Sequence, residues 1–353
     1  MSAPLPPLPA DDLDHVLAHT AKLWSGVRGT RFFITGGTGF FGTWLLESFA
    51  RANDSLGLGL QAVVLTRDPA AFALRAPHLA AREDLRFHQG DLRTFAFPAD
   101  RFDHLVHAAA DTGVWTKNES PAGLIERISE GMRHLLDFAA AARVANFLHV
   151  SSGAVYGPQS PAVTHLTEDD PGQARPLPPG AAWAEGKRVA EQLCLVHAGQ
   201  HGYALKIARC FAFLGPHLDE NYAMGNFLRD ALQGRPITVT GDGTPERSYL
   251  YAADLAAWLW TILLAGVPGR AYNVGSPHGW ALADVARAVA RAASEPSVVR
   301  IAVAPAPGQP PARYVPSVAR AETELGLRVW VGLDDAIRKT LDWQRTAGAI
   351  LSQ

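Results

Sequence analysis

The sequence predicts an α/β fold in which a doubly wound parallel sheet is followed by a smaller C-terminal α/β lobe. Short apolar runs typical of buried strands recur at residues 31–34, 61–65, 85–88, 104–107, 146–150 and 204–208. Helical patterns lie between them, most clearly at 122–142 and 182–201. This alternation requires parallel strands joined by right-handed crossovers. After residue 211 it gives way to glycine, proline and isolated aromatic residues, with helices expected near 254–265 and 281–293.

A glycine-rich turn after the first strand predicts what the sheet binds. The segment Thr35–Gly42 reads TGGTGFFG and precedes a helical pattern at 43–50. Strand, glycine turn and helix in that order are the fingerprint of dinucleotide binding, so we expect a Rossmann-type sheet. Gly36 would permit the tight turn, Gly39 the close approach of a pyrophosphate, and Gly42 the packing of helix on strand. The phosphates would lie on free amides at the helix N-terminus.

The chain is expected to divide into three parts. Residues 1–28 form an N-terminal extension, with a proline-rich and disordered start at Met1–Pro9 and a short amphipathic helix at 12–26, outside the core. Residues 29–210 form the dinucleotide-binding domain. Residues 211–353 form mainly a substrate-binding lobe, part of which returns to the first domain. A ligand would bind in the crevice between the two.

Length, composition and charge exclude several classes of protein. The chain has 353 residues, 48% of them hydrophobic, and a formal net charge of −2, as expected of a soluble globular protein. That balance gives no electrostatic footprint for nucleic acid or an acidic membrane. No signal peptide is expected, and the apolar run 258–267 is too short to span a bilayer, so we expect a cytoplasmic protein. Cys194 and Cys210 are expected to be reduced and buried.

The end of the second predicted strand bears on which dinucleotide is bound. An acidic residue at this position binds the ribose diol of NAD, whereas a nearby arginine accommodates the 2′-phosphate of NADP. The strand ends with Leu65, Thr66, Arg67 and Asp68. Arg67 therefore favours NADP. Asp68 lies one position late for the NAD role and leaves NAD open as the alternative.

Further motifs follow in order and resemble one superfamily. They are Gly90-Asp91-Leu92, His107-Ala108-Ala109-Ala110, VSSGAVYG at 150–157, EGKRVAE at 185–191, Arg209-Cys210-Phe211 with Gly215-Pro216, GDGTPERSY at 241–249, and Glu324-Leu325-Gly326. Together with the glycine turn they extend over residues 31–343. The set resembles the extended short-chain dehydrogenase/reductase superfamily, in its nucleotide-sugar epimerase, dehydratase and reductase branch.

The resemblance implies a site for NADP or NAD and a site for a nucleotide-sugar. The implied cofactor residues are Gly36, Gly39, Phe40, Phe41, Gly42, Arg67, Asp91, Leu92, Ala108, Ala109, Ala110, Lys187 and Cys210. In the family Asp91 would contact adenine and Lys187 the nicotinamide ribose. The implied substrate residues are Ala212, Asn226, Thr238, Val239, Arg247 and Arg313. Both arginines would clamp a diphosphate, for which the bidentate guanidinium is suited.

The catalytic position departs from the family pattern. In the family a tyrosine, whose pKa the lysine lowers, moves a proton while hydride passes to the cofactor, and a serine orients the same oxygen. Ser152 and Lys187 are in place, but Trp183 stands four positions before Lys187. An indole N–H is only a donor, so Trp183 would hold a keto oxygen without shuttling its proton. No tyrosine lies between Tyr156 and Tyr203, and Tyr156 is expected to be mainly structural.

Other residues of the expected site also depart from the family. Ile128 and Ala212 replace asparagines, and Gly153-Ala154 replaces the acidic pair of the 4,6-dehydratases, so elimination of water is not expected. The glutamate of the decarboxylase relatives is also missing at Ala154. Asp111, after the fourth strand, is a candidate carboxylate near the substrate; alternatively it caps a turn.

Metal binding is not expected, because none of the thirteen histidines shows the spacing of a zinc site. His107 belongs to the cofactor motif, and His149 is expected in the core. His197 and His201 are expected to form a surface pair. Arg209 is expected to anchor a strand end.

Three functions are compatible with these residues. The favoured one is an NAD(P)-dependent enzyme acting on a nucleotide-linked sugar, of epimerase or keto-sugar reductase type, with Ser152, Trp183, Lys187 and Asp111 at its catalytic centre. The second is a non-hydride epimerase or isomerase that acts beside an existing ketone, with a structural cofactor and Asp111 as base. The third is a catalytically lapsed cofactor-binding or regulatory protein. A homodimer is expected, because relatives pair the two long helices into a four-helix interface.

Overall fold

The computed structural model describes residues 4, 6–110, 119–172, 179–220, 222–294 and 297–351. The chain divides into two compact units. The first contains Met1–Gly157, Gln173–Cys210 and Ala256–Tyr272, and the second contains Pro158–Gly172, Phe211–Leu255 and Asn273–Gln353. The residues expected to bind the dinucleotide belong to the first unit, and those expected to bind substrate belong to the second.

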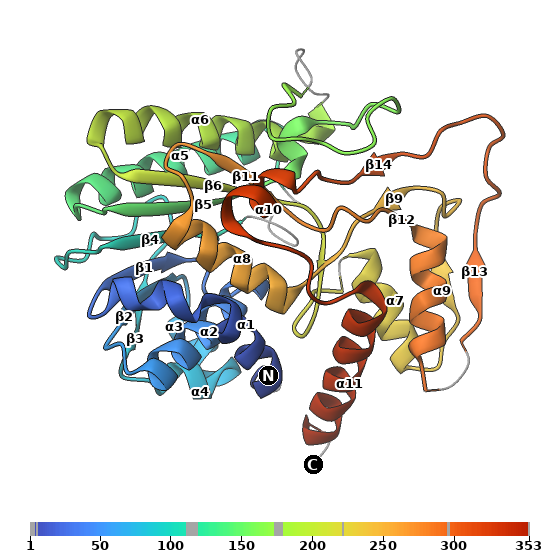
Figure 1. Ribbon diagram of the computed structural model, residues 1–353, viewed down its shortest axis with the longest axis horizontal. Coiled ribbons are helices and arrows are strands. Elements are labelled where there is room, and N and C mark those ends of the chain that lie inside the picture. The colour runs from blue at the N-terminus through green and yellow to red at the C-terminus, as the bar shows by residue number, and fades with distance from the viewer. Residues whose placement is uncertain are drawn as a thin grey trace. The chain divides into compact units, whose positions relative to one another are not determined.

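A seven-stranded sheet of order β11-β6-β5-β4-β1-β2-β3 forms the centre of the first unit (Figure 1). Six strands occur at the predicted positions: β1 (Arg31–Thr35), β2 (Gln61–Thr66), β3 (Leu85–Gln89), β4 (His104–His107), β5 (Asn146–Ser152) and β6 (Ala204–Cys210). These six pair in parallel. The edge strand β11 (Ala271–Val274) was not predicted. The order 3-2-1-4-5-6 confirms the doubly wound Rossmann-type fold, whose ligand crevice lies where the order reverses, at β1 and β4.

Helices α5 (Pro121–Ala141) and α6 (Ala182–His201) pack together and on one face of the sheet (Figure 1). They share a buried apolar cluster with the strands, which includes Phe33, Leu105, Phe147, Met132, Leu135, Phe138, Ala190 and Cys194. Gly186 allows the close approach of the two helices, because a Cβ there would lie 2.6 Å from Cδ1 of Ile128. Ile128, at the position of a family asparagine, is therefore a packing residue.

The N-terminal extension belongs to the core of the first unit, which corrects two predictions. In α1 (Ala10–Trp24) the indole of Trp24 is fully buried, with ring centroids 4.9 Å from Trp260 and 6.5 Å from Phe49. Leu8 is also buried, and its amide donates to Oε2 of Glu47 at 2.9 Å. The expectations of a helix outside the core and of disorder as far as Pro9 were therefore wrong. Aromatic residues distant in sequence supply the packing that local composition does not reveal.

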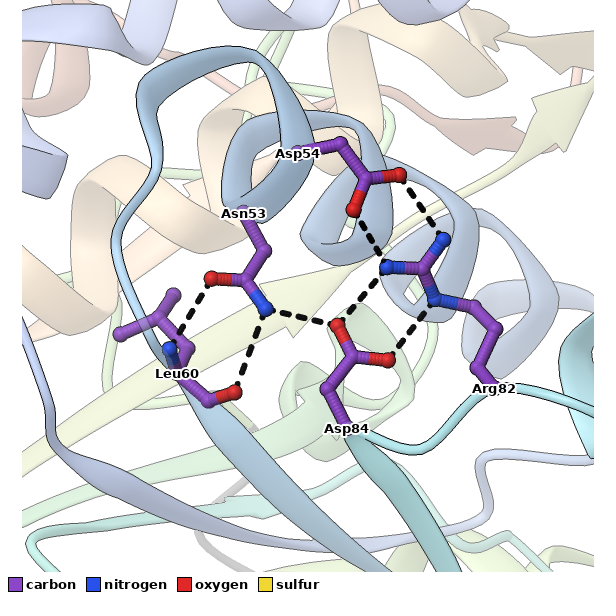
Figure 2. A network of polar contacts seen from close by, with 5 residues as sticks. All are labelled: Asn53, Asp54, Leu60, Arg82 and Asp84. Carbon is purple, nitrogen blue, oxygen red and sulfur yellow. Dashed lines mark hydrogen bonds and ion pairs between the residues drawn. The ribbon is translucent and has the colours of Figure 1, made fainter.

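A polar network fixes the C-terminal end of α2 (Phe40–Leu56), the helix that follows the glycine turn (Figure 2). The guanidinium of Arg82 donates to both oxygens of Asp54, at 2.8 and 2.7 Å, and to both oxygens of Asp84, each at 2.8 Å. The hydrogen bonds that Arg82 donates to these carboxylates raise its pKa. Asn53 donates to Asp84 at 2.6 Å and exchanges hydrogen bonds with the backbone of Leu60. The network ties α2 to the segment before β3.

The described part of the connection between β2 and β3 contains two short helices that were not predicted, α3 (Pro69–Arg75) and α4 (Pro77–Ala80). Asp68 is the N-cap of α3, and its Oδ1 accepts a hydrogen bond from the amide of Ala71 at 2.8 Å. Pro69 follows at the first helical position, which is favourable for proline. The carboxylate of Asp68 thus has a local structural role at the end of β2.

The second unit combines helices with small sheets. Its elements are β7 (Phe213–Leu214), α7 (Ala223–Leu232), β8 (Ile237–Val239), β9 (Glu246–Arg247), β10 (Leu250–Tyr251), β12 (Trp280–Ala281), α9 (Leu282–Ala292), β13 (Val299–Ile301), β14 (Arg313–Tyr314), α10 (Ala319–Leu325) and α11 (Leu333–Leu351). The sheets are β10-β7, β12-β9-β14 and β13-β8. Helix α8 (Ala252–Ala265) is divided between the units. No helix in the described ranges is long and apolar enough to cross a membrane.

Candidate dinucleotide and catalytic site

Gly36 and Gly42, two of the four glycines in the turn, are required by backbone contacts within the protein. Gly36 has φ of +74°, and a Cβ there would lie 2.4 Å from the carbonyl carbon of Ala108 at the end of β4. At Gly42 a Cβ would lie 2.2 Å from the carbonyl oxygen of Gly36, where α2 approaches the turn. Any side chain at either position would collide with backbone atoms. The tight turn and the close packing of helix on strand therefore both depend on glycine, as predicted.

Gly39 is different, because no contact with the described residues requires it to be glycine. Its φ of −90° and ψ of −172° suit any residue, and a Cβ would come no closer than 3.5 Å to another atom, the Gly36 carbonyl oxygen. Gly39 is the N-cap of α2, whose first amides have no acceptor within the helix. A missing side chain beside free amides is what a close pyrophosphate requires. The residues of the turn, with Phe40 and Phe41 in the first turn of α2, thus fit a dinucleotide.

The predicted adenine-side residues lie at the ends of β2 and β3. Arg67 is exposed directly after β2, and Asp91 follows β3. Burial alone would raise the pKa of Asp91, but hydrogen bonds from the side chain and amide of Arg93 outweigh it and lower the pKa. Both bonds go to Oδ1, at 2.9 and 3.0 Å. Leu92 packs against Gly131 of α5. A Cβ at residue 131 would lie 3.0 Å from Cδ2 of Leu92.

The predicted catalytic residues that the structure describes come from β5 and α6. Ser152 ends β5, and its Oγ accepts a hydrogen bond from the amide of Ala154 at 3.1 Å, which leaves its O–H available to donate. Lys187 is buried, and its Nζ donates to the carbonyl oxygen of Val150 at 3.2 Å. The same Nζ lies 5.8 Å from the ring centroid of Trp183. The indole Nε1 of Trp183 is buried and has no hydrogen-bond acceptor among the described residues.

Tyr156 takes part in a structural network. Its hydroxyl accepts a hydrogen bond from Nη1 of Arg209 at 3.0 Å, and the Arg209 guanidinium lies 4.9 Å from its ring centroid. Arg209 also pairs with Glu191 at 2.8 Å, and Ser151 donates to Glu191 at 2.5 Å. The network joins β5, α6 and β6. It confirms the structural interpretation of Tyr156 and the anchoring role of Arg209.

Two neutral histidines lie side by side in the sheet next to this site. His107 and His149 occupy paired positions of β4 and β5, and their rings stack with centroids 5.3 Å apart. Nδ1 of His107 is 2.7 Å from Oγ1 of Thr35. Burial lowers the pKa of His107 to about 3, and Lys187 adds to the effect. Burial and Lys187 likewise place the pKa of His149 well below its usual value. The prediction of a core role for His149 is confirmed.

The remaining candidates of the first unit have plain outcomes. Cys194 and Cys210 are free and buried, and burial raises the pKa of both thiols. His197 and His201 stack on one helix, with Nδ1 of His197 3.1 Å from the hydroxyl of Tyr203. The described ranges contain no group of three His, Cys, Asp or Glu residues that could hold a metal.

The alanines of the cofactor motif, Ala108, Ala109 and Ala110, follow β4. The amide of Ala108 donates to the Thr35 carbonyl oxygen at 3.0 Å. Asp111 lies outside the described residues.

In the second unit the structure brings the two predicted arginines onto neighbouring strands. Arg313 of β14 pairs in register with Glu246 of β9, next to Arg247. Nε of Arg313 donates to Oε2 of Glu246 at 2.8 Å, and Nη1 of Arg247 donates to the carbonyl oxygens of Glu246 and Ala312, at 2.9 and 3.3 Å. Asn226 lies on α7, Thr238 and Val239 lie on β8, which packs against α7, and Ala212 precedes β7. Glu246 thus holds one of the arginines in place.

Sequence reasoning missed one basic residue beside the glycine turn. Arg75, the last residue of α3, donates from Nη2 to the carbonyl oxygen of Thr38 in the turn. No motif marks Arg75, and the helix that carries it was not predicted. Only the three-dimensional contact with Thr38 reveals its place.

The sheet order, the glycine turn and the Ser152–Lys187 pair together define a dinucleotide-binding protein of the extended short-chain dehydrogenase/reductase type. More particularly, the chain belongs to the NAD dependent epimerase/dehydratase family, whose model matches residues 32–275. A dTDP-glucose 4,6-dehydratase of Streptomyces niveus is 26% identical over 321 residues, covering 89% of this chain and 93% of that protein. These findings confirm the predicted resemblance to the nucleotide-sugar branch.

Solved structures show the same fold. The crystal structure of DesIV, a dTDP-glucose 4,6-dehydratase from Streptomyces venezuelae with NAD bound, has a TM-score of 0.72 and 25% identity, covering 90% of this chain and 97% of that one. The structure of RMD from Pseudomonas aeruginosa complexed with NADPH has a TM-score of 0.71 and 22% identity, covering 90% of this chain and 99% of that one. Structures of this fold therefore contain either NAD or NADPH.

Proposed function

We propose that this chain is an NAD(P)-dependent enzyme acting on a nucleotide-linked sugar that carries a ketone, of keto-sugar reductase or epimerase type. The observation that carries the proposal is the pair of hydrogen-bond donors at the catalytic position. The hydroxyl of Ser152 and the indole N–H of Trp183, which has no acceptor among the described residues, are suited to hold an oxygen that only accepts hydrogen bonds. A ketone has such an oxygen. Hydride addition would leave an alkoxide there, which would take up its proton through the Ser152 hydroxyl from solvent, because the indole does not titrate.

Each residue of the first unit then has a stated role. The glycine turn binds the pyrophosphate, Lys187 binds the nicotinamide ribose, and Ser152 and Trp183 orient the substrate oxygen. The bound dinucleotide supplies hydride chemistry. In the second unit Arg247 and Arg313 bind the nucleotide diphosphate, with Glu246 positioning Arg313.

The same donor pair favours a second candidate, a non-hydride epimerase. Hydrogen bonds from Ser152 and Trp183 would stabilise an enolate oxygen as well as a ketone, so a base could remove a C–H proton beside an existing ketone. The dinucleotide would then be structural, and Asp111 is the candidate base. The catalytically lapsed protein remains the third possibility, in which binding persists without reaction.

One labelling experiment separates the three. The protein is incubated with a nucleotide-linked 4-keto sugar and NADPH carrying deuterium at the transferred position, and the sugar is analysed by mass spectrometry. Deuterium gained from the cofactor supports the reductase. In heavy water with unlabelled cofactor, deuterium appearing beside the ketone without cofactor oxidation supports the non-hydride epimerase. No labelling in either experiment, while the dinucleotide still binds, contradicts both enzymatic proposals.

We also propose a homodimer formed through α5 and α6. Apolar side chains remain exposed along α6, with Val189 at 39%, Leu195 at 40% and Val196 at 51% of full exposure. Burying them against a second copy would remove apolar surface from water. Analytical ultracentrifugation at micromolar concentration should show a dimer, and Val196→Lys should shift it towards monomer. A monomeric wild-type protein would contradict this part of the proposal.

A further inference from the structure

Ser151 lies between two groups of the proposed catalytic site. The carbonyl oxygen of Val150, which accepts a hydrogen bond from Nζ of Lys187 at 3.2 Å, belongs to the peptide unit that leads into Ser151. Ser152, whose hydroxyl is proposed to hold the substrate oxygen, follows directly and ends β5. Ser151 itself is buried, and its hydroxyl donates to Oε1 of Glu191 at 2.5 Å. A displacement of Ser151 would therefore move both groups.

Glu191 connects this part of β5 to helix α6. It lies four residues after Lys187, one turn along the same face of the helix. Both of its carboxylate oxygens accept hydrogen bonds from Arg209 of β6, at 3.2 Å from Nε to each and at 2.8 Å from Nη2 to Oε2. Burial alone would lower the pKa of Arg209, but the hydrogen bonds and the charge of Glu191 outweigh it and raise the pKa. Arg209 therefore stays charged and holds the carboxylate in place.

This ion pair fixes the helix in a way that apolar packing does not. The helix α6 also shares an apolar cluster with the strands, but apolar contacts are not directional and leave small shifts of the helix along the sheet open. Hydrogen bonds to a carboxylate are short and directional. A buried ion pair often adds no net stability over apolar residues of the same volume. We therefore look for its benefit in the spacing between α6 and the end of β5.

We propose that Glu191 and Ser151 are positioning residues, in which Glu191 holds Ser151 and thereby sets the spacing between Lys187 and Ser152. Lys187 projects from α6 and Ser152 ends β5, so their relative placement depends on how these two elements are joined. A misplacement of about 1 Å at such a site reduces turnover by about 100-fold. Both positioning residues act through their neighbours rather than by contact with a ligand. The inference rests on the roles of Lys187 and Ser152 in the proposed function.

The test compares two hydroxyl groups of the same network. Ser151→Ala removes the hydrogen bond to Glu191, and Ser151→Thr keeps a hydroxyl as the conservative variant. The matched control Tyr156→Phe removes the hydrogen bond from Arg209 and leaves the ion pair intact. Calorimetry gives the affinities of the reduced dinucleotide and of ADP for each full-length protein, and urea unfolding gives the stability. ADP lacks the nicotinamide ribose that Lys187 is proposed to bind, so the ratio of the two affinities reports the placement of Lys187.

The loss in Ser151→Ala should be selective. Dinucleotide binding should weaken by about 5- to 10-fold and ADP binding by no more than about twofold. Turnover of a nucleotide-linked keto sugar should fall by about 10- to 100-fold, while its KM changes by no more than about twofold. Ser151→Thr should recover most of both losses. Tyr156→Phe should keep the wild-type affinity ratio and turnover, although it also loses stability.

Several results would overturn the inference and leave the proposed function intact. An unchanged affinity ratio in Ser151→Ala would show that the hydrogen bond to Glu191 only stabilises the fold. The same loss in Tyr156→Phe would show that any damage to the network loosens the site, and the same loss in Ser151→Thr would show that packing sets the placement. A wild type that binds the dinucleotide without turnover contradicts the enzymatic proposals, while the affinity ratio still decides the inference. A wild type that binds no dinucleotide overturns both.

Discussion

The glycine turn after β1 and the start of α6 make opposite use of the family pattern. In the turn, Gly36 and Gly42 are required by backbone contacts, whereas the described residues leave room for a side chain at Gly39, where we propose that the pyrophosphate binds. At the end of β5 and the start of α6 the supporting residues Ser152 and Lys187 are in place, but an indole stands where the family has the group that moves a proton. Binding and proton transfer are therefore separable properties of this fold. The first depends on backbone geometry, and the second depends on one titratable side chain.

Two buried histidines beside Lys187 should make the protein less stable as the pH falls. His107 and His149 are neutral in the folded protein because burial and Lys187 lower their pKa values, to about 3 for His107. Between pH 6.5 and the folded pKa the unfolded chain binds these protons and the native state does not, so stability falls as the pH falls. From pH 7.5 to pH 5 the two should cost about 4 kcal/mol of unfolding free energy.

Urea unfolding as a function of pH checks this expectation. His149→Asn should remove about 2 kcal/mol of the pH-dependent loss, whatever it does to stability at pH 7.5. His278→Asn, at an exposed position in the second unit, serves as the control and should change the pH dependence far less than His149→Asn. If the unfolding free energy falls with pH equally in His149→Asn and in the wild type, the buried pair is not the source of the loss.

The glycine turn can be tested by adding a single methyl group at each of two positions. Gly36→Ala places a Cβ against backbone atoms of Ala108 at a positive φ and should cost about 2–4 kcal/mol of stability. Gly39→Ala has room within the protein and should leave stability within about 0.5 kcal/mol. It should nevertheless lower dinucleotide affinity at least tenfold, because the methyl group occupies the place of the pyrophosphate. Unchanged affinity in Gly39→Ala would contradict the assignment of the turn.

Sequence reasoning succeeded where the determinants are local. Strand positions and the glycine turn follow from apolar runs and from glycines whose spacing reflects backbone contacts. It failed where the determinant is a distant partner: the burial of Trp24 depends on Trp260, and the ordering of Leu8 depends on Glu47. Arg75 was missed for the same reason, since its role depends on the carbonyl of Thr38.

Tyr156 provides the smallest test, because its phenol follows β5 closely and could be mistaken for the proton donor. Its hydroxyl is bound to Arg209, so Tyr156→Phe should cost about 1 kcal/mol of stability through the lost hydrogen bond. At saturating substrate, the turnover rate with a nucleotide-linked keto sugar should change by less than about twofold, because losing the hydroxyl should not alter the activation barrier. A large loss of turnover with unchanged stability would assign Tyr156 to the catalytic centre.

The central claim is that the glycine turn and Lys187 suffice to bind the dinucleotide, and that Trp183 limits proton transfer. The most direct measurement compares wild type, Trp183→Tyr and Trp183→Phe for dinucleotide affinity and for reduction of the dinucleotide by a panel of nucleotide-sugar alcohols across pH. All three should bind the dinucleotide equally, with a modest cavity cost in the variants. Only Trp183→Tyr should gain hydride transfer, with a pH dependence that reports the new phenol beside Lys187. No gain in Trp183→Tyr with intact binding, or an equal gain in Trp183→Phe, would contradict the claim.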